Sequence, residues 1–267
     1  MMGRIKRNLR IVRVLINLRL QNLMMFRLGF FGPFFVDSCV FLVQLCVFEV
    51  IYSNVNRIGT WGKGQMILYI GTFSMINAIN MVIYFFGINS IPDKIKNGDM
   101  DLYLTKPGSP LLRLTFERIN PGSVPLLFLS GVIITYGIKA GGIKITPILV
   151  LGYVFWVAIM TVLYYLVEVL IRSFTFFILT SGNTIILEEA GLTLCMQLPG
   201  IVFYGVYKVI FYVILPYGIM ATIPVQFLTG ELTFAGAVWG ILVAAGFTLL
   251  TAFVWKQGIR HYNSASS

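Results

Sequence analysis

Acidic side chains within or beside apolar stretches are the residues of this chain best placed to do chemistry. They are Asp37, Glu49, Glu168, Glu188 and Glu189. A carboxylate surrounded by hydrocarbon is costly, so it pairs, hydrogen-bonds or relays protons or ions. No cation paired with them at depth is evident from the sequence. We therefore favour bonds between helices for most of them and helix-end positions for Glu49 and Glu168. Asp37 and Glu188 are the two candidates for a functional role.

A second polar feature is a stripe in an otherwise apolar segment, where Ser74, Asn77 and Asn80 recur every third residue. These side chains either line a polar path or hydrogen-bond neighbouring helices, and the sequence leaves both readings open. The candidate path residues are Asp37, Asn77, Asn80 and Glu188.

Other motifs that carry chemistry are missing from the sequence. It has no GxxxxGK[ST] motif to hold nucleotide phosphates, and its single histidine, His261, lies in the polar tail. The cysteines Cys39, Cys46 and Cys195 form no CxxC pair, so neither a disulfide framework nor a zinc site is indicated. We therefore expect no catalytic residue, no metal and no cofactor on this chain.

The composition sets the elements that hold these residues: 58% of the chain is hydrophobic and only 11% is charged. An ordinary soluble domain is about 25% charged, so we expect an all-α polytopic membrane protein with the lipid bilayer around it. The net charge of +10 is concentrated beside apolar segments and forms no separate basic surface. This pattern argues against nucleic acid as a partner.

The apolar segments have the lengths of membrane crossings, since a helix needs about 20 apolar residues to cross a core of about 30 Å. We predict one transmembrane domain over residues 1–267, with six crossings at 26–53, 64–88, 124–138, 148–171, 173–195 and 232–255. The segment 197–228 is predicted to be re-entrant. It contains Pro199, Pro216 and Pro224, and prolines interrupt a continuous helix.

A second arrangement of 173–228 also fits. In it, 173–206 lies along the membrane surface and 209–228 makes the fifth crossing. Both arrangements give six crossings. We prefer the first because irregular backbone is tolerated at membrane depth where protein or water covers it.

The N-terminal segment 1–24 has an apolar face whose residues recur at spacings of three and four, as on one side of a helix. These residues are Ile5, Leu9, Val12, Ile16, Leu20 and Leu23. Lysines and arginines cover much of the remaining surface, so we expect an amphipathic helix in the headgroup layer.

The distribution of basic residues orients the chain, because lysine and arginine are retained on the cytoplasmic side. With six crossings, 15 of the 20 lysines and arginines fall on the side of the N-terminus. The others are Arg57, Lys63, Lys139, Lys144 and Lys208. We expect both termini in the cytoplasm and the chain in the cell membrane, specifically a prokaryotic inner membrane.

The only substantial polar connection is the loop 89–123, on the predicted cytoplasmic side. Ser90 with Asp93 three residues later resembles a capping box, and Pro92 suits a first helical turn. Gly98 ends the helix. Two helical turns are unstable alone in water, so either a partner protein or the membrane helices of this chain must hold them.

The loop sequence IKNGDMDLYLTKPGSPLL, followed by Arg118, resembles the permease subunits of type-2 ABC exporters. The amphipathic N-terminal helix, the six crossings and the tail GIRHYNSASS extend the resemblance over nearly the whole chain. Within that class, it is similar to the short permeases called ABC-2 family transporter proteins. The resemblance implies the type-2 exporter fold, with a connecting helix at 1–24 and re-entrant helices at 197–228.

The resemblance further implies a half-transporter. Two copies of a separate ATPase subunit would bind ATP and Mg²⁺, and a second permease, identical or related, would complete the assembly. The residues expected to couple this chain to the ATPase are Ile91, Pro92, Asp93, Ile95, Lys96, Gly98, Asp101, Leu102, Tyr103 and Lys106.

The function implied is ATP-driven export of an amphipathic or hydrophobic compound, such as a drug, peptide, lipid or glycolipid. The alternative is a membrane scaffold that transports nothing and recruits a cytosolic partner through the loop 89–123. A membrane enzyme is disfavoured because no nucleophile, base or metal cluster occurs.

Overall fold

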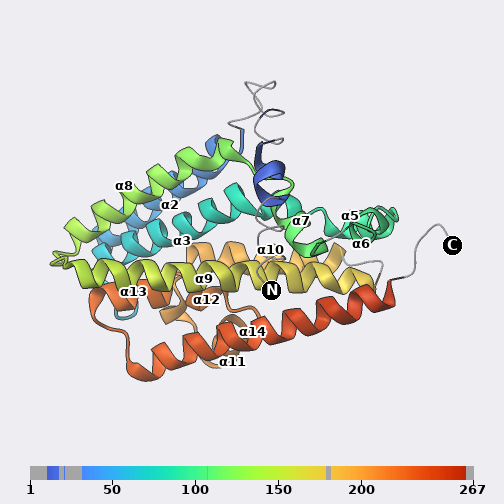
Figure 1. The fold of residues 1–267 in the computed structure, drawn as a ribbon. Coiled ribbons are helices and arrows are strands. Elements are labelled where there is room, and N and C mark those ends of the chain that lie inside the picture. Colours follow the sequence, from blue (N-terminus) through green and yellow to red (C-terminus); the bar gives the residue numbers. More distant parts are fainter. Residues whose placement is uncertain (1–10, 18–20, 22–31, 107, 179–181, 263–267) are drawn as a thin grey trace.

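The computed structural model describes residues 11–17, 21, 32–106, 108–178 and 182–262, and these ranges are mainly helical (Figure 1). Five segments are long and apolar enough to cross a membrane: Phe34–Asn54, Lys63–Ile83, Pro121–Ala140, Pro147–Phe176 and Phe234–His261. A further pair of helices, Gly205–Ile214 and Tyr217–Thr229, is bent by 78° and is either a broken span or a re-entrant loop. The predicted all-α polytopic membrane fold is confirmed.

The long helices are α2 (Gly32–Asn54), α3 (Lys63–Ile83), α8 (Val124–Ala140), α9 (Pro147–Ser173) and α14 (Phe234–His261). They lie where the crossings 26–53, 64–88, 124–138, 148–171 and 232–255 were predicted. One prediction is interrupted: α3 stops before Tyr84, whose φ of −133° leaves the helical region, and a short turn, α4 (Phe85–Ile88), follows. Residues 26–31 and most of the predicted N-terminal helix lie outside the described residues, although 11–17 are helical.

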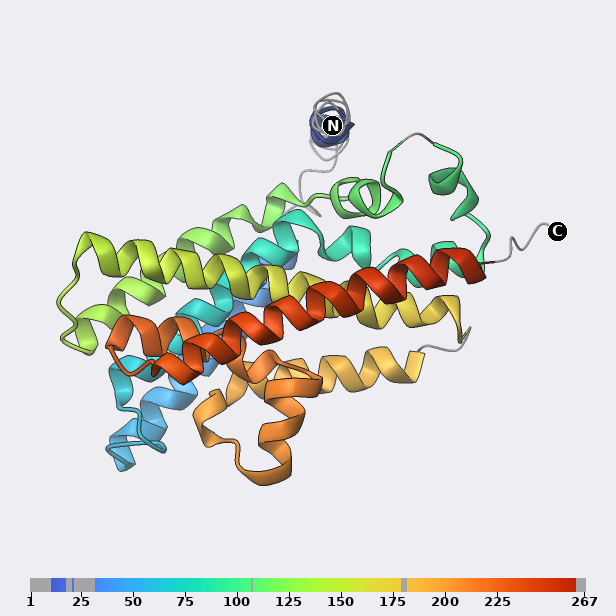
Figure 2. The same cartoon turned by 60° about the horizontal axis from the view of Figure 1, so that its bottom comes forward.

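Helices α2, α3, α8 and α9 alternate in direction along one axis, and α14 runs in the same direction as α9 (Figures 1 and 2). The loop 89–123, the C-terminal end of α9 and the C-terminal end of α14 lie together at one end of the bundle, which we call the loop end. The connections 55–62, 141–146 and 230–233 lie at the opposite end, which we call the far end.

Helix α10 (Gly182–Gln197) lies where the fifth crossing, 173–195, was predicted. Its 16 residues extend about 24 Å, which is less than the hydrocarbon core of about 30 Å. The chain beyond it reaches the far end, since a Cβ atom on Gly59 would lie 3.3 Å from Ile201 Cδ1. The chain then turns back through η4 (Gly200–Val202), α11 (Gly205–Val209), η5 (Ile210–Ile214), α12 (Tyr217–Met220) and α13 (Thr222–Thr229). The bent pair of helices over 205–229 is compatible with either arrangement of 173–228, so both arrangements stay predictions.

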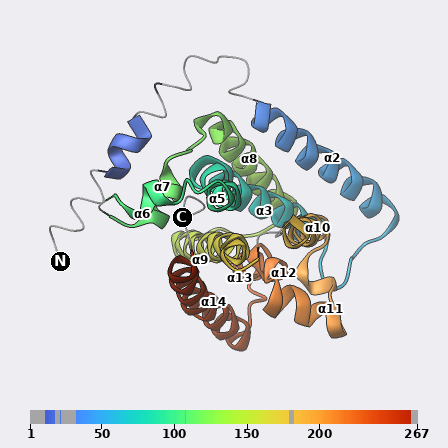
Figure 3. The same ribbon diagram turned by 90° about the vertical axis from the view of Figure 1, so that its right-hand side faces the viewer.

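Helix α3 lies in the middle of the bundle, with α8 and α9 on two sides of it (Figure 3). Small residues let α3 and α8 approach closely. A Cβ atom on Gly71 would lie 2.9 Å from the backbone nitrogen of Ile134, and one on Gly137 would lie 2.7 Å from that of Leu68. Glycine at these two positions is what permits the observed spacing of the two helices.

Candidate functional site

The loop 89–123 begins with a two-turn helix, α5 (Ile91–Lys96), that is held by the protein itself. Ile91 and Ile95 are buried in an apolar cluster with Val169 of α9 and Trp255 of α14. Pro92 is buried as well. Ile95 lies about one helical turn after both Ile91 and Pro92, so the three side chains share the inner side of the helix. These three predicted coupling residues therefore face the bundle and position the helix.

The two ends of α5 were only partly foreseen. Ser90 forms no capping box: its backbone is already helical, and its hydroxyl donates to the carbonyl of Gly87 at 2.7 Å. Gly98 does end the helix, with a left-handed φ of 78°. The amide of Met100, just beyond it, donates to the carbonyl of Lys94 at 3.1 Å.

Four of the other predicted coupling residues are exposed on the outer surface of the loop. Asp93, Lys96 and Lys106 are exposed, and Leu102 of α6 (Asp101–Leu104) is 58% exposed despite its apolar side chain. Asp101 is half-buried. Burial of Tyr262 raises the pKa of that tyrosine, and the nearby negative charge of Asp101 raises it further. The surface available to a partner therefore combines both signs of charge with one protruding leucine.

A polar network joins the pieces of the loop. Lys94 of α5 forms an ion pair with Glu117, the residue that follows α7 (Pro110–Phe116). The Tyr103 hydroxyl of α6 donates to the same carboxylate at 2.6 Å, and the Lys94 ammonium lies 4.3 Å from the Tyr103 ring centre. Burial lowers the pKa of Lys94, an effect that Glu117 opposes. Burial and the hydrogen bond to Glu117 raise the pKa of Tyr103.

This network changes the interpretation of Tyr103. It was predicted as a contact for the ATPase, but it is half-buried and braces α6 on α7. Because one carboxylate binds both Lys94 and Tyr103, α5, α6 and α7 form one cross-linked unit. Sequence reasoning did not identify Glu117, since nothing in the spacing of residues 94, 103 and 117 predicts their contact.

A buried charge cluster lies directly behind the loop. Arg172, near the end of α9, contacts Glu168 one turn earlier at 2.6 Å and Glu188 of α10 at 2.9 Å. All three side chains are at most 3% exposed. The second oxygen of Glu188 accepts a 2.7 Å hydrogen bond from the Tyr217 hydroxyl of α12. Two carboxylates thus share one guanidinium inside the bundle.

The cluster corrects two expectations. Glu168 lies near the end of α9, as expected, but its side chain is buried inside the protein. A cation, Arg172, is paired with the buried acids, although none was evident from the sequence. The spacing of Glu168 and Arg172 by four residues was a usable signal, but the predicted crossing ended at residue 171, one residue before Arg172. The contact from Arg172 to Glu188 joins two helices and is not visible in local sequence. Glu49, by contrast, is exposed and pairs with Lys63 at 2.5 Å.

Arg172 also contacts the first residue of the loop. Its Nε donates to Asn89 Oδ1 at 3.3 Å, and Asn89 immediately precedes the turn into α5. Asn89, Arg172, Glu188 and Tyr217 therefore form a continuous chain of polar contacts from the loop to α10 and α12. We call these four residues the polar chain.

The remaining candidate path residues are not part of the polar chain. Within the described parts of the molecule, no hydrogen bond or ion pair joins Glu188 to Asp37, Asn77 or Asn80. Asn77 and Asn80 are buried in α3, and the Asn80 amide has no hydrogen-bond partner among the described residues. Ser74 of the same stripe shares a 2.7 Å hydrogen bond with Ser130 of α8, as the helix-bonding reading predicted.

A large groove separates α2 from α10 and has a volume of about 610 Å³. Its lining is mainly apolar, with polar side chains from both walls, including Gln44 and Thr193. The Gln44 amide donates to the backbone carbonyl of Met196, so the two helices are joined at one level. Glu188 also belongs to α10, but its side chain does not line the groove and instead pairs with Arg172.

The described residues form a polytopic helical membrane protein. Its loop 89–123 is joined to α9, α10 and α12 by the polar chain. A model of the family described as ABC-2 family transporter protein matches residues 39–266. The chain belongs to this family and is the permease of an ABC transporter, for which a separate ABC-type ATPase subunit is implied. Neither the curated proteins nor the solved structures give a match.

Proposed function

We propose that this permease exports an amphipathic or hydrophobic compound from the cytoplasm, using ATP hydrolysed by the partner ATPase. The observation that carries the proposal is the polar chain, which connects the start of the loop to α10. A displacement of α5 by the ATPase would be passed through Asn89 and Arg172 to Glu188, so that α10 moves relative to α2 and changes the groove between them. The apolar lining of that groove suits a hydrophobic cargo.

The proposed orientation places the loop end in the cytoplasm with both termini. Lys94, Lys96, Lys106, Arg118, Lys256 and Arg260 lie on elements at this end. The far end carries fewer basic residues, such as Arg57, Lys63, Lys139 and Lys144. This asymmetry supports the orientation. The proposed location is the inner membrane of a prokaryote.

The proposed assembly contains two permeases, identical or related, and two ATPase subunits that hold ATP and Mg²⁺. The exposed residues Asp93, Lys96, Leu102 and Lys106 would touch the ATPase. Ile91, Pro92, Ile95, Gly98 and Tyr103 would shape that surface from within. Purification in mild detergent tests this assembly, and we expect an ABC ATPase and a second permease to accompany the chain. Recovery of a cytosolic partner without ATPase activity would instead support the membrane scaffold.

A matched pair of variants on α10 tests the coupling role. Glu188→Gln removes the charge that binds Arg172, whereas Glu189→Gln changes the neighbouring exposed residue of the same helix. We expect Glu188→Gln to reduce ATP-driven transport in reconstituted vesicles while ATPase subunits still co-purify. Glu189→Gln should leave both unchanged. Equal transport by the two variants would overturn the route through Arg172.

A further inference from the structure

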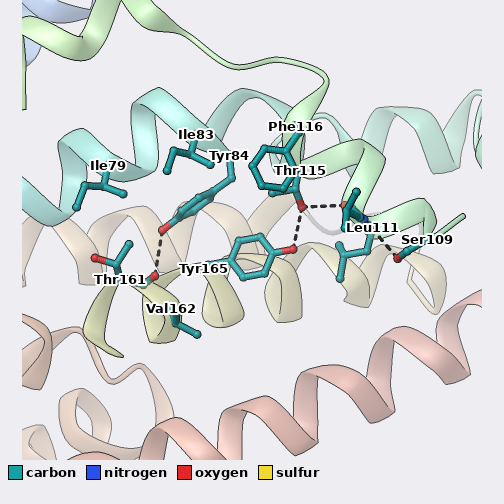
Figure 4. A pocket seen from close by; sticks show the side chains of 11 residues that line it. Ile79, Ile83, Tyr84, Ser109, Leu111, Thr115, Phe116, Thr161, Val162 and Tyr165 are labelled. Carbon is teal, nitrogen blue, oxygen red and sulfur yellow. Dashed lines mark hydrogen bonds between the residues drawn. The ribbon is translucent and has the colours of Figure 1, made fainter. Parts of the chain in front are cut away.

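A groove of about 400 Å³ opens between α3, α7 and α9, on the flank of the bundle near the loop end (Figure 4). Its lining residues are Ile79, Ile83, Tyr84, Ser109, Leu111, Leu112, Thr115, Phe116, Thr161, Val162 and Tyr165. It is separate from the groove between α2 and α10 and from the polar chain. Neither the family nor the proposed function assigns it a ligand.

Four hydroxyl groups in this groove, those of Tyr84, Thr115, Thr161 and Tyr165, already form hydrogen bonds within the protein. Thr115 and Tyr165 share a 2.8 Å hydrogen bond, and the Tyr84 hydroxyl donates to the carbonyl of Thr161 at 3.3 Å (Figure 4). The Thr161 hydroxyl donates to the carbonyl of Val157 at 2.8 Å. Because these donors are already engaged within the protein, the groove suits an apolar occupant.

The groove adjoins a stripe of exposed apolar residues on α9. Ile148, Leu151, Phe155 and Val162 are exposed and lie at spacings of three, four and seven residues, so they form one stripe along the helix. Val162, which is 53% exposed, is both part of this stripe and a wall of the groove. A hydrocarbon chain in contact with the stripe can therefore enter the groove without crossing a polar barrier.

The long axis of the groove runs along the bundle, which is the direction in which the acyl chains of a bilayer lie. It extends from Ile79 and Val162, within the spans, to Leu111 and Ser109 at the loop end (Figure 4). Thr161 lies 12 residues before Ser173, the last residue of α9, which corresponds to about 18 Å along the helix. This is close to the depth of one leaflet, since the whole hydrocarbon core is about 30 Å thick.

We propose that this groove binds one acyl chain of a membrane phospholipid from the leaflet on the loop side. The chain would lie along α9 with its end between Ile79 and Val162 and its glycerol end near Ser109. It would cover the half-buried Leu111, Leu112 and Phe116 of α7 and brace that helix against α3 and α9. Lipid is then a structural part of the attachment of the loop, whether or not the ATPase is bound.

Photo-crosslinking of the full chain tests the proposal. The protein is placed in vesicles of phosphatidylethanolamine and phosphatidylglycerol that contain a phosphatidylcholine with a diazirine in the middle of one acyl chain. Peptide mass spectrometry then locates the labelled residues. We expect label to be concentrated in the peptides that contain Leu111–Phe116 and Thr161–Tyr165, at levels several-fold above that around Leu151, which is 70% exposed.

A filled groove supplies the matched comparison. Val162→Trp should reduce labelling of α7 several-fold, whereas Leu151→Trp, on the same stripe but outside the groove, should leave it unchanged. Val162→Phe is a smaller filler to use if the tryptophan variant unfolds, and melting curves check that each variant is folded. Labelling along α9 that follows exposure alone, or labelling of α7 that a folded filler leaves unchanged, would overturn the proposal.

Discussion

Arg172 and Glu188 form a 2.9 Å ion pair that joins the end of α9 to α10, and both side chains are almost fully buried. Charges inside a membrane protein are expensive and commonly have a functional role. Here the pair also lies between the loop and α12, because Arg172 binds Asn89 and Glu188 binds Tyr217. This buried ion pair therefore lies on the route that the proposed coupling uses between the loop and α12.

Removing the cation alone should destabilise the fold strongly. Arg172→Met leaves Glu168 and Glu188 buried together without a counterion, and breaking a buried ion pair costs about 3–5 kcal/mol. Replacing all three with apolar residues, as Arg172→Met with Glu168→Leu and Glu188→Leu, should restore most of the lost stability, since such replacements are often neutral. The measurement is the unfolding midpoint in mixed micelles.

The triple variant also separates stability from coupling. If the cluster transmits movement, the triple variant should fold and bind the ATPase but transport poorly. Full transport by a stable triple variant would show that the charges serve only the packing of α10.

Charge reversal on the outer face of α5 should weaken ATPase binding without loss of fold. Asp93→Arg and Lys96→Glu change exposed side chains, and surface substitutions typically alter stability by less than about 0.5 kcal/mol. Lys144→Glu, at the far end, is the control. Co-purified ATPase should fall for the two α5 variants and stay constant for the control. An ATPase yield unaffected by either α5 variant would place the contact elsewhere.

Only part of the loop structure could be predicted from local sequence. Its helix, its stop at Gly98 and the long spans follow from residue spacing, apolar length and the conformational freedom of glycine. The inward direction of Ile91 and Ile95 does not follow, because a one-turn spacing of apolar residues predicts a buried face without indicating which protein covers it. For the same reason, the i, i+4 spacing of Glu168 and Arg172 predicts that they share one face of a helix. The contact of Arg172 with Glu188, in contrast, depends on how α9 and α10 pack. The contact of Lys94 with Glu117 depends likewise on the path of the chain between them.

The contribution of Tyr103 should depend on alkaline pH. Tyr103→Phe removes the hydrogen bond to Glu117, which is worth about 1.5–3 kcal/mol when the acceptor is charged. The pKa of Tyr103 is raised above its ordinary value of 10.0 in the folded protein. Between these two pKa values the folded state holds a proton that the unfolded state has released, so this stabilisation is complete below pH 10 and declines above it.

The difference in unfolding free energy between the natural protein and Tyr103→Phe isolates this effect, because the other tyrosines are common to both. That difference should be constant from neutral pH to about pH 9 and shrink above pH 10. Leu102→Ala, which changes an exposed side chain of the same helix that does not titrate, should show no such trend. A Tyr103 difference that grows with pH would contradict the assigned direction of the pKa.

Two glycines of α8 offer a sharp test of its packing on α3. A Cβ atom on Gly137 would lie 2.7 Å from the backbone nitrogen of Leu68, whereas one on Gly131 would meet nothing within 4 Å. Gly137→Ala should therefore push the helices apart and destabilise the fold by about 1–3 kcal/mol. Gly131→Ala should be neutral or stabilise by about 0.5–1 kcal/mol, because alanine is the better helix former. Unfolding midpoints of the two variants in the same detergent decide the matter, and equal shifts would mean that α3 and α8 do not pack through Gly137.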